Sequence, residues 1–247
     1  PGLKENQPLR NINRVITMKK YNKIKKILFA AICGGLFIAC QQPHNVNDPL
    51  QVLCLGNSIT KHPIKEDIEW FSDWGMAASN IEYDYCHQLE KMLCKYHPNS
   101  TVTPLNIASW ERNLSCDIDS LIGSYCKNKD IIIIRLGENV QDVTTFPDAI
   151  SRLVKYCQSK AKRVIITGCF WKNDSKERSI IHAARTNDLT YVPLYWIDNL
   201  YNVRPQIGDT LYDINKKPYV ITQDFIITHP NDEGMQMIAE TIWGVIR

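Results

Sequence analysis

The sequence predicts an α/β fold in which helices cover both faces of a parallel sheet of about five strands. Apolar runs of strand length alternate with stretches of helical spacing, and the four isoleucines at 131–134 form a run without polar alternation. Such a run is typical of a strand that is covered on both faces. Repeated strand–helix–strand units give a parallel sheet with right-handed crossovers.

Each element can be delimited in the sequence. The expected strands are 51–56, 101–107, 130–136, 163–167 and 189–194. Apolar residues at helical spacing predict helices over 83–96, about 113–126, 147–159, 176–185 and 232–246. Four of these helices lie between successive strands, as crossovers in a parallel sheet must.

The charge of the chain is unevenly distributed along its length. Of the 247 residues, 29 are Lys or Arg, and residues 1–40 hold eight of these but a single acid, Glu5. The rest of the chain has 21 basic and 25 acidic residues, a net charge of −4. We expect one domain over 49–247, large enough to bury a sizeable core. Its mildly acidic composition gives no support for nucleic-acid binding.

The basic N-terminal region is typical of an export signal. Residues 18–39 begin at Met18 with a lysine-rich segment and continue into an apolar run of about a dozen residues. This run is shorter than the roughly 20 residues that a membrane-spanning helix needs. The segment 37–40, Phe-Ile-Ala-Cys, resembles a bacterial lipobox, in which the cysteine is lipidated and becomes the mature N-terminus.

We therefore expect an exported protein, anchored in the bacterial cell envelope by a lipid on Cys40. Plain secretion and an uncleaved anchor are the alternatives. Residues 40–48 are polar and are interpreted as a tether. Residues 1–17 precede the methionine that opens the signal and are interpreted as an upstream segment outside the fold.

Nine cysteines are present, of which two belong to the leader. The other seven are an odd number, so at least one thiol is unpaired. Export permits disulfide bonds, and the spacing allows Cys116–Cys126 or Cys86–Cys94. The sequence has no Cys-x-x-Cys motif and no Cys/His cluster at zinc spacing, so neither a metal nor an organic cofactor is expected.

Three groups suited to acyl transfer stand at element ends. Ser58 follows the first strand in Gly56-Asn57-Ser58, Asn139 follows the third strand, and His229 precedes the last helix. Chemistry in such folds collects where the carboxyl ends of the strands meet. A serine hydroxyl needs a neighbouring base, which a histidine supplies, and an amide can donate to a developing oxyanion. Taken singly, each is better explained by a structural role, as a cap, a turn residue or a loop residue.

Taken together and in this order, Gly-Asn-Ser, Gly-x-Asn and His-Pro resemble the sequence blocks of the SGNH (GDSL-like) hydrolases. The resemblance spans about residues 50–247. It implies a three-layer α/β/α sandwich with a flavodoxin-like sheet and the activity of a serine esterase. It also implies Ser58 as nucleophile, His229 as base, and an oxyanion hole that combines the Ser58 amide with Asn139.

Three positions depart from the family pattern. The family usually has Gly-Asp-Ser, whereas Asn57 stands in the place of the aspartate here, a tolerated change because both side chains hydrogen-bond locally. Where the family has a glycine whose amide completes the oxyanion hole, this chain has Glu111, whose amide is still able to donate while its side chain either crowds or recognises the substrate. The family acid stands three residues before the histidine, at Ile226 here, and isoleucine cannot orient an imidazole. We favour Asp224 in its place. A backbone carbonyl that orients His229, or another acid such as Asp232, is the alternative.

The segment 62–79 follows the nucleophile and is rich in aromatic residues. Trp70 and Trp74 are expected either to form a wall for a sugar or acyl group or to pack as a local hydrophobic cluster. The leading hypothesis is hydrolysis of an acyl ester, above all an acetyl ester, on a small molecule or glycan through an acyl-enzyme. A lipid or thioester hydrolase and an inactive glycan-binding protein are the alternatives.

Overall fold

Five parallel strands form the sheet of this protein, which a computed structural model describes over residues 48–247. They are β1 (Gln51–Gly56), β2 (Thr101–Asn106), β3 (Ile131–Ile134), β4 (Arg163–Thr167) and β5 (Thr190–Val192). Their order is β2-β1-β3-β4-β5, and every neighbouring pair is parallel. The predicted parallel sheet is confirmed, and its strand order is that of flavodoxin-like folds.

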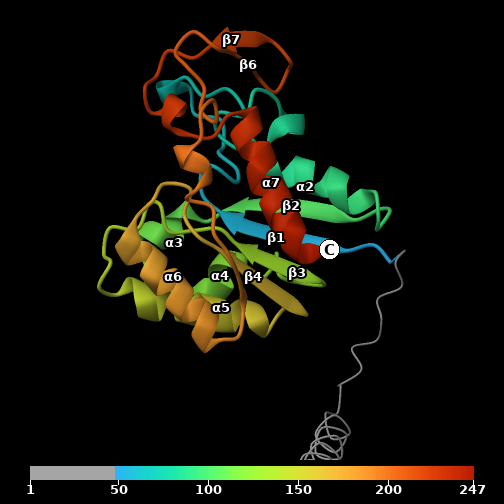
Figure 1. Cartoon of the computed structure of the whole chain (residues 1–247), viewed down its shortest axis with the longest axis vertical. Coiled ribbons are helices and arrows are strands. Elements are labelled where there is room, and N and C mark those ends of the chain that lie inside the picture. Colours follow the sequence, from blue (N-terminus) through green and yellow to red (C-terminus); the bar gives the residue numbers. More distant parts are fainter. Residues whose placement is uncertain (1–47) are drawn as a thin grey trace, which may run out of the picture. The chain divides into compact units, whose positions relative to one another are not determined.

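Helices cover both faces of the sheet (Figure 1). One layer contains α2 (Tyr85–Cys94) and α7 (Asp232–Ile246), and the other contains α5 (Phe146–Gln158) and α6 (Asp174–Thr186). The predicted three-layer sandwich is therefore confirmed. Two short helices, α3 (Ala108–Arg112) and α4 (Ile118–Ile122), replace the single helix that was expected over about 113–126. Asp117 separates them because its side chain caps α4 by accepting from the Asp119 amide.

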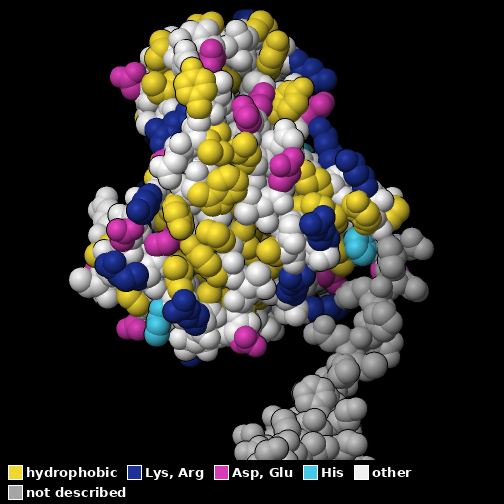
Figure 2. Space-filling view, in the orientation of Figure 1, with side chains coloured by type: hydrophobic (Ala, Val, Ile, Leu, Met, Phe, Trp, Pro, Cys, Tyr) yellow, Lys and Arg dark blue, Asp and Glu magenta, His cyan; other side chains and the backbone are white. Residues whose placement is uncertain are grey.

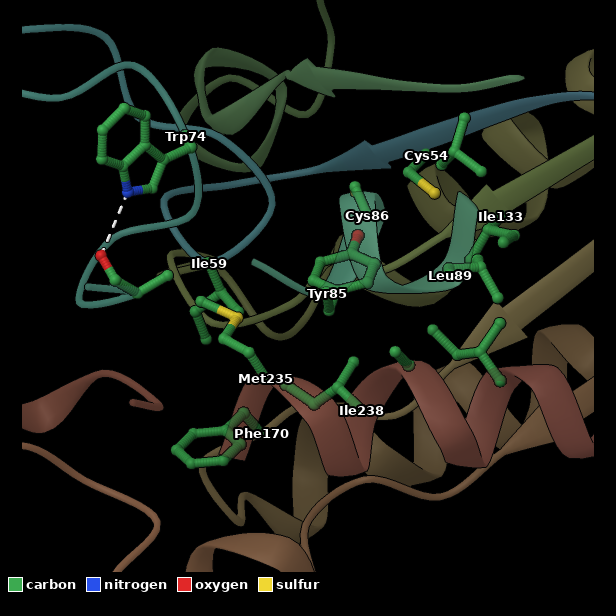
Figure 3. Close-up of a cluster of buried hydrophobic side chains, with 14 of the residues drawn as sticks. Cys54, Ile59, Trp74, Tyr85, Cys86, Leu89, Ile133, Phe170, Met235 and Ile238 are labelled. Carbon is green, nitrogen blue, oxygen red and sulfur yellow. Dashed lines mark hydrogen bonds between the residues drawn. The ribbon is translucent and has the colours of Figure 1, made fainter. Parts of the chain in front are cut away.

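The isoleucines of β3 face two different hydrophobic cores. Ile131 and Ile133 pack under α2 and α7, whereas Ile132 and Ile134 pack under α5 and α6. All four are buried, which explains why the run lacks polar alternation. Figure 3 shows part of the first core, to which Ile133 and Leu89 of α2 both contribute.

A two-stranded antiparallel hairpin, β6 (Thr210–Tyr212) with β7 (Pro218–Val220), lies between β5 and α7 in the chain. The hairpin was not predicted from the sequence, because its strands are only three residues long. It is joined to the segment after β1, since the Tyr212 amide donates to Ser79 O at 2.9 Å and the Ser72 hydroxyl donates to Tyr212 O at 2.8 Å. The hairpin therefore covers that segment (Figure 1).

The seven cysteines in the described part of the chain are all free thiols, so neither of the two disulfide bonds that the spacing allows is formed. Cys86 and Cys94 both lie on α2. Eight residues of helix separate their Cα atoms by about 12 Å, roughly twice the separation that a disulfide bond spans.

The predicted upstream segment, the signal and the lipidated Cys40 lie outside the described residues, as does nearly all of the tether. Over residues 48–247, no helix combines the length and the apolar character required to cross a membrane. Within the same range, no group of three His, Cys, Asp or Glu side chains is placed to hold a metal ion.

Candidate active site

Ser58 lies at the end of a tight turn that follows β1. Gly56 is required there, because a Cβ atom at this position would lie 1.8 Å from Thr60 Oγ1. The turn continues with the amides of Thr60 and Lys61 donating to Asn57 O at 2.9 and 3.0 Å. Ser58 O accepts from the Met76 amide at 2.8 Å, so the backbone of the serine is held on both sides. Ser58 is half-buried, with its hydroxyl directed to the base described next.

His229 lies between a single 3₁₀ turn, Ile226–Thr228, and the start of α7. Its amide donates to Ile226 O at 3.0 Å, and its side chain is buried. His229 Nε2 lies 2.9 Å from Ser58 Oγ, although 171 positions separate the two residues in the chain. The structure thus brings the predicted hydroxyl and imidazole within hydrogen-bond distance.

A backbone carbonyl orients the imidazole. His229 Nδ1 lies 2.9 Å from Phe225 O, and because a carbonyl only accepts, Nδ1 carries the proton and Nε2 is free to accept from Ser58. The preferred interpretation, that Asp224 orients His229, is wrong for this structure. Asp224 is exposed, and among residues 48–247 no hydrogen bond or ion pair joins it to His229. Asp232 is engaged elsewhere, with the amide and hydroxyl of Ser79.

The environment of His229 keeps its imidazole neutral. Burial lowers the pKa of His229 to about 4, and the positive field of His62 and Arg135 acts in the same direction. The hydrogen bond to Phe225 O and the charge of Glu138 oppose this shift without cancelling it. At neutral pH the side chain is therefore in the form that can take a proton from Ser58.

Asn139 and Glu111 are joined in the wall beside the Ser58 turn. Glu111 lies in α3 and is 1% exposed, and its Oε2 accepts from Asn139 Nδ2 at 2.7 Å. Its Oε1 accepts from the amides of Gly137 at 2.6 Å and Asn139 at 3.3 Å. The expectation that the Glu111 side chain crowds or recognises substrate is wrong, because the carboxylate turns inward to these donors.

Gly137 makes the loop after β3 possible. Its φ of 136° lies in a region that favours glycine, and a Cβ atom there would lie 2.6 Å from Cys169 Sγ. The turn brings the amides of Gly137 and Asn139 onto one carboxylate, that of Glu111. Within the described chain no hydrogen bond uses the Ser58 amide, so this predicted oxyanion donor is free.

A buried ion pair lies behind this wall. Arg135 Nη1 donates to Glu138 Oε1 at 2.6 Å, and both side chains are at most 1% exposed. Asn57 links the pair to the nucleophile turn, because its Nδ2 donates to Glu138 Oε2 at 2.7 Å and its Oδ1 accepts from Arg135. Burial acts to raise the pKa of Glu138, but Arg135 and the hydrogen bonds from Phe170 and Asn57 outweigh it and lower that pKa. Glu138 is therefore ionised.

Trp70 and Trp74 do not form the expected aromatic wall, because both side chains are buried. Trp70 and Trp74 are buried in the core under α2 and α7, and each indole nitrogen is satisfied internally, by His62 O at 3.1 Å and Ala78 O at 3.0 Å. Figure 3 shows Trp74 in this setting. The substrate-binding interpretation of these residues is wrong, and the alternative of a hydrophobic cluster describes them.

One aromatic residue beside His229 was missed. Trp171 follows β4, is half-buried, and sets its ring edge-on to His229, with centroids 5.2 Å apart and planes at 86°. Its indole nitrogen donates to Thr228 O at 2.9 Å. The signal available in the sequence was its position just after the fourth strand, at the same edge of the sheet as Ser58 and Asn139.

Comparison with solved structures finds this fold in known hydrolases, one of which is an esterase. LAE5, an alpha/beta hydrolase enzyme from the metagenome of Lake Arreo, Spain, has a TM-score of 0.55 and 13% identity, over 80% of this chain and 95% of its own. Axe2, an acetylxylan esterase from Geobacillus stearothermophilus, has a TM-score of 0.55 and 14% identity, over 81% and 95%. No protein-family model and no curated protein sequence matches this chain. At these identities the likeness establishes the fold.

Proposed function

We propose that this chain is a carboxylic ester hydrolase of the SGNH type, with Ser58 as nucleophile and His229 as general base. The observation that carries the proposal is the 2.9 Å separation of Ser58 Oγ and His229 Nε2 at the carboxyl edge of the sheet. The fold shared with LAE5 and Axe2 supports it.

In the first half of the reaction, His229 Nε2 takes the Ser58 proton as Oγ bonds to the acyl carbon of the ester. The carbonyl oxygen becomes an oxyanion, which the Ser58 amide and Asn139 Nδ2 stabilise by hydrogen bonds. The imidazolium returns its proton to the leaving alcohol as the carbon–oxygen bond breaks. An acyl group remains on Ser58.

In the second half, His229 takes a proton from water, whose oxygen attacks the acyl carbon. Collapse of the second oxyanion breaks the bond to Ser58, and the proton on Nε2 returns to Oγ. The products are the free acid and the regenerated hydroxyl. Throughout, the hydrogen bond from His229 Nδ1 to Phe225 O fixes the orientation of the imidazole. The carbonyl dipole also partly stabilises the imidazolium, a task that a carboxylate performs in a catalytic triad.

For the substrate we propose an acetyl ester on a carbohydrate. Trp171 offers an apolar wall next to His229. Axe2, with the same fold, is an acetylxylan esterase. We further propose that the protein acts outside the cytoplasm, anchored by a lipid on Cys40, on the strength of the signal-like residues 18–39 and the lipobox-like segment that follows.

A second candidate function is glycan binding without turnover. It is favoured because no carboxylate in the part of the chain that the structure describes bonds to His229, and loss of the acid in a serine protease lowers kcat by about 10⁴. The geometry favours catalysis, because the base is already neutral, oriented and in contact with the nucleophile.

The test is hydrolysis of 4-nitrophenyl acetate, acetylated xylose oligosaccharides and a longer acyl ester by the wild type and by Ser58→Ala. We expect turnover by the wild type, strongest on acetyl esters, and none above background for the variant. Ser159→Ala is the matched control, because its hydroxyl bonds Tyr156 O at the end of α5, away from the site. Wild-type rates equal to those of Ser58→Ala on every ester would overturn the proposal and leave glycan binding.

A further inference from the structure

The Glu111 carboxylate is a buried group that the reaction as written does not use. It stands where the SGNH pattern has a glycine, yet it is 1% exposed. A buried carboxylate is costly unless hydrogen bonds and charge compensate it. Burial and the neighbouring Glu138 raise the pKa of Glu111, whereas the bonds from Asn139 and Gly137 and the charge of Arg135 oppose the rise.

The donors that satisfy Glu111 come from both sides of the oxyanion hole. The loop after β3 supplies Asn139 Nδ2 at 2.7 Å and two backbone amides. The turn after β1 supplies Asn57 Nδ2, which lies 3.2 Å from each carboxylate oxygen and precedes Ser58. Glu111 thus joins the nucleophile turn to the loop that carries the amide donor.

All of the hydrogen bonds to the Glu111 carboxylate come from N–H donors, so both of its oxygens act as acceptors. A group that only accepts distinguishes the two ends of an amide side chain. Asn139 must present its nitrogen to Glu111 Oε2, because its carbonyl oxygen would be repelled there. One hydrogen of Nδ2 is used in this bond, and the second is left to donate elsewhere. With an apolar side chain or a glycine at position 111, the amide would be free to turn over and present its oxygen.

We propose that Glu111 is a positioning residue, which holds the Asn139 amide with its nitrogen toward the oxyanion and so prearranges the hole before substrate binds. This inference rests on the proposed esterase activity. It assigns Glu111 a role through its side chain, in contrast to the backbone donation expected from the sequence. Prearranged donors avoid reorganisation as charge develops, which is how an oxyanion hole lowers a barrier.

The test is the nearly isosteric substitution Glu111→Gln. Glutamine presents an NH₂ group to Asn139 in place of one oxygen, so the asparagine amide reverses and directs its own oxygen into the hole. We expect kcat to fall by about 10² to 10³, as for loss of one oxyanion donor, with KM changed less than about threefold. Turnover is counted per Ser58 titrated with a phosphonate ester, so an unfolded fraction does not enter the result.

Glu90→Gln is the matched control, because Glu90 Oε2 accepts from the Val102 amide at 2.7 Å near the start of β2, at the opposite edge of the sheet. Its kcat should equal that of the wild type. Glu111→Asp keeps a group that only accepts hydrogen bonds, so its kcat should be at least tenfold higher than that of Glu111→Gln. If the glutamine variant does not fold, the kcat of Glu111→Asp is compared with that of the wild type.

The outcomes separate the two proposals. An active wild type whose Glu111→Gln variant keeps kcat within about threefold would overturn the role of Glu111. The role of Glu111 would also be overturned if kcat of Glu111→Asp were no higher than that of Glu111→Gln, or if Glu90→Gln lowered kcat as much as Glu111→Gln does. A wild type without turnover would instead overturn the esterase proposal itself.

Discussion

The two sides of the candidate site are held by different kinds of interaction. On the base side, the backbone carbonyl of Phe225 orients His229, and no carboxylate within residues 48–247 bonds to the ring. On the oxyanion side, the charged side chains of Glu111, Glu138 and Arg135 are buried together and tie down Asn139 and its loop. Relative to the SGNH pattern, this chain has Ile226 in place of the acid near the proposed base, and Glu111 in place of a glycine near Asn139, the proposed oxyanion donor.

The difference shows that orientation and charge stabilisation are separable tasks. A carbonyl orients an imidazole as well as a carboxylate does, but as a dipole it stabilises the imidazolium less, and burial then keeps the pKa of His229 low. A carboxylate next to Asn139 orients the amide firmly. Its negative charge opposes a developing oxyanion, and Arg135 within the same network offsets part of that cost.

The largest effect should come from removing the base. His229→Ala is expected to lower kcat by about 10⁴ to 10⁶, because Ser58 then has no proton acceptor. Steady-state kinetics on an acetyl ester measures the effect. His182→Ala on the exposed side of α6 is the control and should be unchanged. A loss below about tenfold for His229→Ala would show that another group acts as base.

The next effect concerns the oxyanion side. Asn139→Ala should lower kcat by about 10² to 10³ with little change in KM, since one donor to the oxyanion is removed. Rates are again counted per titrated serine. Asn187→Ala removes an asparagine that donates to Ala183 O at the end of α6 and is expected to leave kcat intact. Equal rates for Asn139→Ala and the wild type would exclude Asn139 from the hole.

The pH dependence of kcat/KM tests the protonation state of His229. Because His229 must be neutral and burial lowers its pKa to about 4, kcat/KM should rise with pH through about 4 and stay level to neutral pH. A triad carboxylate bonded to the imidazole would raise the pKa of the histidine, so kcat/KM would rise at a higher pH. A limb near pH 6.5 or above would contradict the low pKa.

The same shift makes stability depend on pH. The unfolded chain binds the His229 proton with a pKa near 6.5, about 2.5 units above the folded one, so unfolding is favoured as pH falls from about 6.5 to about 4. The contribution is roughly 3 kcal/mol at the acid end of that window. Urea unfolding of the wild type and of His229→Gln measures it, and parallel pH profiles for the two would contradict it.

The smallest effect is expected at Asp224. Because Asp224 is exposed and does not contact His229, Asp224→Ala should change kcat by less than about twofold, whereas loss of a true triad acid costs about 10⁴. The same kinetic assay decides it. A loss of a hundredfold or more would mean that the carboxylate reaches the imidazole during turnover.

The sheet could be predicted from general rules, because apolar runs located all five strands. The rule that carboxyl ends of parallel strands gather at one edge applied to Ser58 and Asn139, which follow the first and third strands. The pairing of Ser58 with His229 was implied by the resemblance of three ordered sequence blocks to the SGNH hydrolases, and the two side chains do lie within hydrogen-bond distance.

The orienting group and the aromatic wall could not be predicted, for two physical reasons. The partner of His229 is the carbonyl of Phe225, and any residue has a carbonyl, so no side chain signals it. Trp70 and Trp74 stand in a segment without regular periodicity, so their burial depends on the hairpin β6–β7 and on α7, which are distant in sequence. The inward turn of Glu111 likewise depends on donors 26 to 28 positions away.

The most direct test of the Ser58–His229 pair is covalent labelling with a phosphonate ester that mimics the tetrahedral intermediate, followed by mass spectrometry of the digested protein. The pair predicts a single adduct on the peptide that contains Ser58, formed rapidly by the wild type and at least a thousandfold more slowly by His229→Ala. An adduct on another serine, or equal labelling rates in the two proteins, would contradict it.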